Sequence, residues 1–118
     1  MHELSIVLNI IEISEQEARN AGAESISCIE LDIGKLSTIE PAAFDFAWKQ
    51  GVRGSMLEQA ELITNYIPGK GRCSNCRTVF DLNALYDPCP ECGEYLSEVV
   101  EGKELKIKSI RIEEKLVT

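Results

Sequence analysis

Histidine and long apolar runs are scarce in this sequence. The chain has 118 residues and a single histidine, and no stretch of about 18 consecutive apolar residues occurs, so no transmembrane helix is expected. The first 13 residues are too short for a signal peptide, and His2, Glu3 and Glu12 stand where such a peptide needs a basic start. We therefore expect a cytoplasmic protein.

Basic charge is also in short supply. The chain has 12 Lys and Arg against 20 Asp and Glu, and residues 1–68 hold 4 basic and 11 acidic side chains. No basic patch is available to neutralise phosphates, so nucleic-acid binding is disfavoured. An acidic surface instead suits divalent cations or a basic protein partner. The sequence also lacks a nucleophile–base pair, a Gly-x-Ser-x-Gly turn and a phosphate-binding loop, so we expect no enzyme.

Apolar periodicity predicts two helices and three strands. The first helix is expected over residues 4–21 and the second from a Thr38 N-cap and Pro41 to about residue 50. Alternation of apolar and polar residues predicts strands over 25–34, 60–67 and 105–112. We therefore expect an α+β fold with two helices on one face of a three-stranded sheet. The apolar positions of the helices are Leu4, Val7, Leu8, Ile10, Ile11, Ala18, Phe44, Ala47 and Trp48.

A cysteine-rich segment interrupts this pattern. Residues 69–97 contain four of the five cysteines and little apolar periodicity, and Gly69-Lys70-Gly71 is typical of a hinge at the start of the segment. We expect residues 1–68 together with 98–118 to form the α/β domain, with 69–97 inserted into it. The fifth cysteine, Cys28, lies in a predicted strand and is expected to be a buried core thiol.

Cys73, Cys76, Cys89 and Cys92 form two C-x-x-C pairs separated by twelve residues. Each pair places two thiolates on one side of a turn, and two such turns can enclose a tetrahedral metal ion. Four soft thiolates favour Zn(II), with a rubredoxin-type iron centre as the next alternative. Structural disulfides are disfavoured in a cytoplasmic chain, and neither pair opens a helix after a strand as a thioredoxin-like pair would. Since four protein ligands leave no position for catalytic water, we expect a structural or regulatory zinc.

The N-terminus offers a second set of ligands. Met1 and His2 together supply an α-amine, a backbone amide and an imidazole nitrogen, which close a five-membered and a six-membered chelate ring. With the amide deprotonated this set is planar, as Ni(II) and Cu(II) prefer, and Glu3 can supply a further ligand. Such a site is pH-dependent, because its amine and amide must lose protons.

With these two signals in one chain, the sequence resembles the HypA/HybF family of nickel metallochaperones for [NiFe]-hydrogenase maturation. The resemblance covers essentially the whole chain, although the histidines that flank the cysteines in some members are missing here. Besides Met1-His2-Glu3 and the four cysteines, the similar segments are Ile33-Gly34-Lys35-Leu36-Ser37, Glu40-Pro41, Phe44-Asp45-Phe46-Ala47, Gly54-Ser55 and Gly102-Lys103-Glu104-Leu105.

The resemblance implies a nickel carrier. It assigns Met1, His2 and Glu3 to the nickel site and Cys73, Cys76, Cys89 and Cys92 to zinc. It implies delivery of Ni(II) to the hydrogenase large-subunit precursor, together with a HypB-type nickel-binding GTPase, and service to urease maturation in some members. Either a monomer or a homodimer is compatible with the sequence. The alternative function is a zinc-ribbon protein-interaction module without a nickel role.

Overall fold

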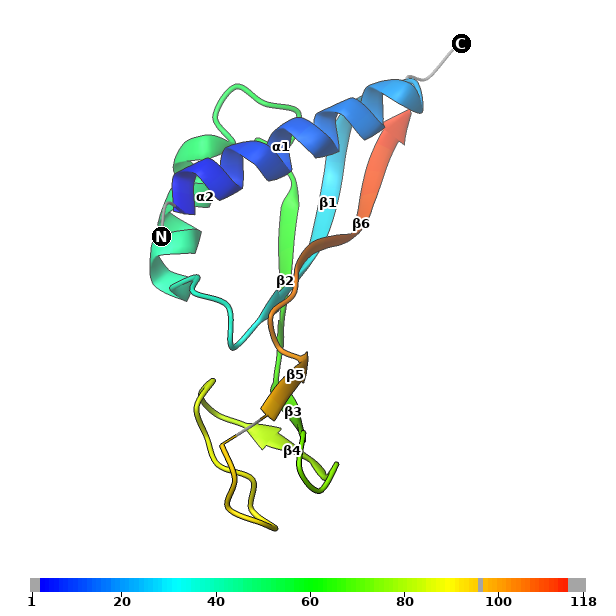
Figure 1. The fold of residues 1–118 in the computed structure, drawn as a ribbon. Coiled ribbons are helices and arrows are strands. Elements are labelled where there is room, and N and C mark those ends of the chain that lie inside the picture. Colours follow the sequence, from blue (N-terminus) through cyan, green and yellow to red (C-terminus); the bar gives the residue numbers. More distant parts are fainter. Residues whose placement is uncertain (1–2, 96, 115–118) are drawn as a thin grey trace. The chain divides into compact units, whose positions relative to one another are not determined.

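Two helices and six strands make up the described part of the chain, which is residues 3–95 and 97–114 of a computed structural model (Figure 1). Met1 and His2 lie outside it. Neither described helix is long and apolar enough to cross a membrane. The elements are α1 (Glu3–Asn20), β1 (Ala23–Gly34), α2 (Pro41–Gly51), β2 (Glu61–Ile67), β3 (Gly69–Cys73), β4 (Val79–Leu82), β5 (Ser97–Glu101) and β6 (Leu105–Glu114).

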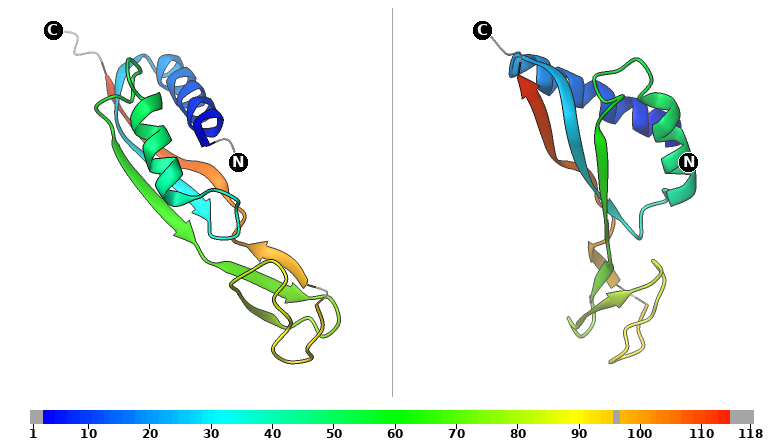
Figure 2. Two further views of the ribbon diagram at one scale, coloured as in Figure 1. Left: turned by 90° about the vertical axis from the view of Figure 1, so that its left-hand side faces the viewer. Right: turned by 180° about the vertical axis from the view of Figure 1, so that it is seen from behind.

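The strands form two sheets of three strands, ordered β2-β1-β6 and β4-β3-β5. The first sheet confirms the predicted three-stranded sheet, and both helices lie on the same side of it (Figure 2). The predicted α+β class, with two helices on a three-stranded sheet and a four-cysteine module, is therefore confirmed. The second sheet lies within residues 69–101, which include the cysteine-rich segment, and was not predicted.

The chain packs into two units. The helical unit comprises Met1–Leu31, Ile39–Thr64 and Ile107–Thr118, and the cysteine unit comprises Asp32–Thr38 and Asn65–Lys106. The cysteine unit contains all of residues 69–97 and adds the ends of neighbouring strands. Whether 69–97 folds as a domain inserted between 1–68 and 98–118 stays a prediction.

Helix α1 buries one stripe of its surface in the helical unit. The stripe consists of Val7, Ile10, Ile11, Ser14 and Ala18, at the three- and four-residue spacing of a helix face. Leu4 and Leu8 were predicted to belong to it but are 48% and 49% exposed, since they lie at its edge. After Asn20, Gly22 takes a left-handed backbone conformation with φ of 76°, which ends the helix.

Helix α2 begins at Pro41, and its N-cap is Glu40 rather than the predicted Thr38. A carboxylate oxygen of Glu40 accepts a hydrogen bond of 2.8 Å from the backbone N–H of Ala43, so it satisfies one of the free donors of the first turn. Proline at the first helical position fixes the cap one residue earlier, which leaves Thr38 outside the helix. As predicted, α2 buries Phe44, Ala47 and Trp48.

Strand β1 contributes buried core residues to the first sheet. Ile29, Leu31 and Ile33 are at most 1% exposed, as the alternation with Glu30 and Asp32 predicts. Cys28 is half-buried rather than buried, because it has the opposite parity to these three residues. Buried Asp32 accepts a hydrogen bond of 3.0 Å from the side-chain amide of Asn65 on β2.

Gly69-Lys70-Gly71, interpreted from the sequence as a hinge, instead begins strand β3, which lies in the centre of the small sheet. Lys70 and Arg72 face outward, while Gly69 and Gly71 are buried. A Cβ atom built on Gly71 would lie 2.6 Å from Leu82 Cδ1, and one on Gly69 would lie 2.7 Å from Leu36 Cδ1. The glycines therefore make room for the core of the cysteine unit.

Candidate metal centre

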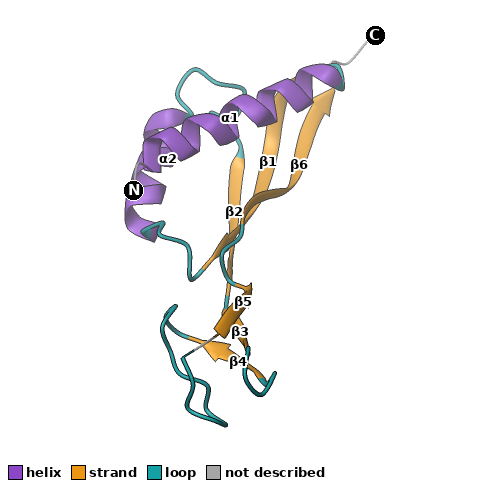
Figure 3. Ribbon diagram, in the orientation of Figure 1, coloured by secondary structure: helices purple, strands orange, loops and turns teal. Residues whose placement is uncertain are grey.

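The four cysteines lie on two turns of the cysteine unit. Cys73 is the last residue of β3 and Cys76 follows in the turn toward β4, whereas Cys89 and Cys92 lie in the long loop between β4 and β5 (Figure 3). The two turns are closed in the same way. The N–H of Arg77 donates to the carbonyl oxygen of Cys73, and that of Gly93 donates to Cys89, each at 2.8 Å.

These turns bring the four sulfur atoms together, all within 4.8 Å of one another. Two of the separations that join one turn to the other are 3.5 Å, between the Sγ atoms of Cys73 and Cys92, and 3.6 Å, between those of Cys76 and Cys89. A disulfide requires about 2.05 Å, so all four thiols are free. The chain thus has a four-cysteine metal-binding group.

The donor set fits a zinc ion. Zinc binds thiolates at about 2.3 Å, and a regular tetrahedron of that size places its sulfurs about 3.8 Å apart. These two distances between the turns are within about 0.3 Å of this value. Zinc would be held by Cys73, Cys76, Cys89 and Cys92, and its chemistry there would be to join the two turns.

One half of the cluster is buried and the other half is exposed. Cys73 and Cys89 pack against Leu36, Phe80 and Leu82 in the core of the cysteine unit. Cys76 and Cys92 are exposed to solvent. A metal ion would therefore connect the core of this unit to its surface turns.

Hydrogen bonds prepare two of the thiols to act as ligands. The Thr78 side chain, whose Oγ1 lies 3.1 Å from Cys76 Sγ, and the Thr78 N–H lower the pKa of Cys76 to about 6. The pKa of Cys73 is also lowered, chiefly by the backbone N–H of Cys76. Because a metal binds the thiolate, these bonds reduce competition from protons.

Cys92 differs from these two. The backbone N–H of Glu94 and the Asn75 side chain lower its pKa, but burial and the neighbouring sulfurs of Cys73 and Cys76 raise it further, to about 11. Adjacent thiolates repel one another, so a bound cation would favour the thiolate form of Cys92.

Of the three predicted nickel ligands, the structure describes only Glu3. Met1 and His2 lie outside the described residues. Glu3 is the first residue of α1 and is half-buried. Its Oε2 atom is buried and has no hydrogen-bond partner among the described residues.

Thr78 and Asn75 were missed by the sequence analysis. Both lie in or beside the first cysteine turn and donate to its sulfurs or to those of the second turn. The signal was present, since a polar residue between or just after paired cysteines is well placed to donate to a thiolate. It is a weak signal, because such residues are also common in ordinary turns.

The α+β fold and its four-thiol group define a small metal-binding protein. Residues 1–112 match the family described as "Hydrogenase/urease nickel incorporation, metallochaperone, hypA". The chain belongs to this HypA family.

Individual relatives match over nearly their whole length. The hydrogenase maturation factor HypA of Parabacteroides distasonis is 49% identical over 112 residues, which are 95% of this chain and 97% of that protein. The factor of the same name from Geobacter sulfurreducens is 41% identical over 113 residues, which are 96% of this chain and 100% of that protein. The solution structure of the Ni metallochaperone HypA from Helicobacter pylori has a TM-score of 0.71 at 26% identity, covering 98% of this chain and 100% of that one.

Proposed function

We propose that this chain is a nickel carrier that binds Ni(II) at its N-terminus and delivers it to the large-subunit precursor of [NiFe]-hydrogenase. The ligands are the α-amine of Met1, the backbone amide and imidazole of His2, and Glu3. The chain acts as a carrier rather than a catalyst. Its partners are a HypB-type nickel-binding GTPase and the precursor, and urease maturation proteins are a further destination.

The observation that carries the proposal is the closure of the cysteine site. All four sulfurs lie within 4.8 Å of one another, so one tetrahedral ion uses all of them. We assign this site to a resident Zn(II), which leaves no open position for a cargo ion. A carrier needs a second site whose ligands can be exchanged with a partner, and the N-terminus supplies it.

The chemistry of Glu3 supports this assignment. The buried Oε2 atom of Glu3 has no hydrogen-bond partner within the described ranges, and such an oxygen is costly because its desolvation is not compensated. A metal ion bound at the preceding residues would compensate it. In addition, Glu3 lies in the first turn of α1, where a negative side chain offsets the positive end of the helix dipole that would repel a cation.

Nickel titration tests the proposal. The untagged, zinc-loaded protein is titrated with Ni(II) beside His2→Ala and, as a matched control, Cys28→Ser, by calorimetry and absorption spectroscopy. We expect one nickel per chain in the parent and in Cys28→Ser and none in His2→Ala, with one zinc retained in all three.

Two results would contradict the proposal. Equal nickel binding by His2→Ala would move the cargo site elsewhere in the chain. If no form of the protein binds nickel, a zinc-stabilised protein-interaction module becomes the better interpretation.

A further inference from the structure

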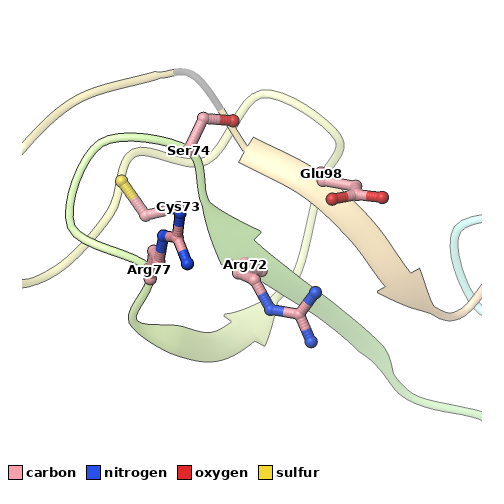
Figure 4. Close-up of a pocket in the computed structure, with 5 residues that line it drawn as sticks. All are labelled: Arg72, Cys73, Ser74, Arg77 and Glu98. Carbon is pink, nitrogen blue, oxygen red and sulfur yellow. The ribbon is translucent and has the colours of Figure 1, made fainter.

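A pocket beside the first cysteine turn is not used by the proposed metal chemistry. Its volume is about 400 Å³, and it is lined by Arg72 of β3, by Cys73, Ser74 and Arg77 of the turn, and by Glu98 of β5 (Figure 4). All five residues belong to the cysteine unit. Two guanidinium groups at one pocket are notable in a chain with an excess of acidic residues.

Strand register shows why positive charge accumulates at this end of the small sheet. On the outer face, Lys70 lies directly between Asp81 of β4 and Glu101 of β5, so two carboxylates flank it. Arg72 lies between Val79 and Glu98, so an apolar residue replaces one carboxylate. Arg77 then adds a second cation. The pocket therefore contains two guanidiniums and one carboxylate.

Neither guanidinium is neutralised by a neighbour. Arg72 and Arg77 are exposed, and neither forms an ion pair with any residue in the described ranges 3–95 and 97–114. Their donors are therefore available to a ligand. A guanidinium presents its N–H groups as a fork that matches the two oxygens of a carboxylate.

The backbone of Arg77 supplies an independent observation. Its φ is 63°, which makes it the one non-glycine residue with positive φ among the described residues. The equivalent position of the second turn is Gly93, with φ of 76°. A side chain in this conformation is strained relative to glycine. The first turn thus carries an arginine where glycine would be more stable, and the guanidinium is the feature that glycine lacks.

The pocket also indicates the charge of its ligand. Glu98 on the far side repels a dianion more strongly than a monoanion. Val79, directly opposite Arg72 in the register and 53% exposed, offers an apolar contact that phosphate cannot use. A side-chain carboxylate next to an apolar residue satisfies both features.

From these observations we propose that Arg72 and Arg77 bind a glutamate or aspartate side chain in an acidic segment of a protein partner, with a neighbouring apolar side chain against Val79. This role is independent of nickel binding, so it can be tested in the nickel-free protein.

The test uses the full zinc-loaded chain and a fluorescein-labelled, C-terminally amidated peptide of alternating Glu and Leu, followed by anisotropy. Arg77→Gly and Arg72→Gln should each weaken binding by about tenfold, the loss expected for one charge-assisted hydrogen-bonding group. Arg53→Gln, which removes the same charge from the helical unit, should change binding by less than about twofold. Glu98→Gln should strengthen binding by roughly threefold, because it removes the repelling charge.

A structural role for Arg77 gives different results. If Arg77 only balances the negative charge of the metal-bound thiolates, Arg77→Gly will bind zinc more weakly and leave peptide binding unchanged. On our proposal this variant keeps its zinc and is at least as stable as the parent, because glycine relieves the backbone strain. Zinc affinity and thermal unfolding of Arg77→Gly therefore separate the two roles.

The controls on the ligand complete the test. A peptide with Gln in place of Glu should not bind, and acetate should displace the acidic peptide better than inorganic phosphate does at equal charge concentration. Stronger displacement by phosphate would identify a phosphate site and overturn the proposal. Failure of the acidic peptide to bind the parent protein would also overturn it.

Discussion

Gly34 and Gly102 lie in direct contact within the cysteine unit. A Cβ atom built on Gly34 would collide with the carbonyl oxygen of Gly102. That oxygen accepts a hydrogen bond of 2.7 Å from the N–H of Leu36, and the N–H of Gly34 donates to the carbonyl oxygen of Glu104 at 2.7 Å. The end of β1 is thereby bound to the segment between β5 and β6, and only glycine permits so close an approach of two backbones.

Gly34→Ala is expected to destabilise the cysteine unit by about 3 kcal/mol or more, because the methyl group meets backbone rather than a movable side chain. Urea unfolding, followed through the amide signals of the cysteine unit, measures the change. Gly54→Ala is the control. It strains a left-handed residue with φ of 75° but meets nothing within 4 Å, so about 1 kcal/mol is expected. Equal effects in the two variants would show that the contact with Gly102 is unimportant.

Glu40→Ala should destabilise the helical unit by about 1 kcal/mol, since it removes the side-chain acceptor for the Ala43 N–H. Thr38→Ala should have almost no effect, because Thr38 is exposed and precedes the helix. Thermal unfolding of the two variants compares them directly. If Thr38→Ala destabilised the protein more than Glu40→Ala, Thr38 would be the N-cap, as the sequence predicts.

Cys73→Ser should abolish stoichiometric zinc binding and disorder the cysteine unit, because Cys73 is fully buried and also packs in the core of that unit. Cys28→Ser should retain one zinc, since Cys28 lies outside the cluster. Removal of zinc from the parent protein with a chelator should disorder the cysteine unit in the same way. Both helices belong to the helical unit, so the circular dichroism signal of helix should survive while amide dispersion of the cysteine unit is lost. Retention of that dispersion without metal would contradict this expectation.

Thr78→Val should make zinc release occur at higher pH. The Thr78 hydrogen bonds lower the pKa of Cys76 from 9.0 to about 6, so its thiolate persists as the pH falls until about 6. Loss of the hydroxyl donor raises this pKa, and protons then compete with zinc at a higher pH. We expect the midpoint of zinc release to rise by roughly 0.5 pH unit. Thr64→Val, on β2 in the helical unit, is the control, and an unchanged midpoint in Thr78→Val would exclude a role for the hydroxyl.

One residue added before Met1 should abolish nickel binding. The extension converts the α-amine into an amide and moves His2 out of the chelate, while Glu3 and the cysteine site remain. The same residue added after Thr118 should leave one nickel bound per chain. Calorimetry on the two extended proteins checks this, and undiminished affinity in the first would show that the amine is not a ligand.

Local sequence patterns were enough to predict the three-stranded sheet with its two helices and the ligands of the four-cysteine group. Strong apolar alternation at Ile29, Leu31 and Ile33 predicted a buried strand, because one face of a sheet must exclude water. The spacing of the four cysteines predicted their convergence, because a tight turn between paired cysteines leaves few other geometries.

Tertiary structure decided the features that depend on neighbours distant in the chain. Strand β3 places glycine where a strand normally places an apolar residue, and only the positions of Leu36 and Leu82 explain why. Because α2 begins at Pro41, the side chain of Glu40 reaches a free N–H of the first turn, so Glu40 rather than Thr38 is the N-cap. The charge of the pocket at Arg72 and Arg77 likewise came from strand register, which sets Val79 rather than a carboxylate opposite Arg72. The periodicity of apolar residues indicates which residues are buried. The residues that they contact depend on how the whole chain packs.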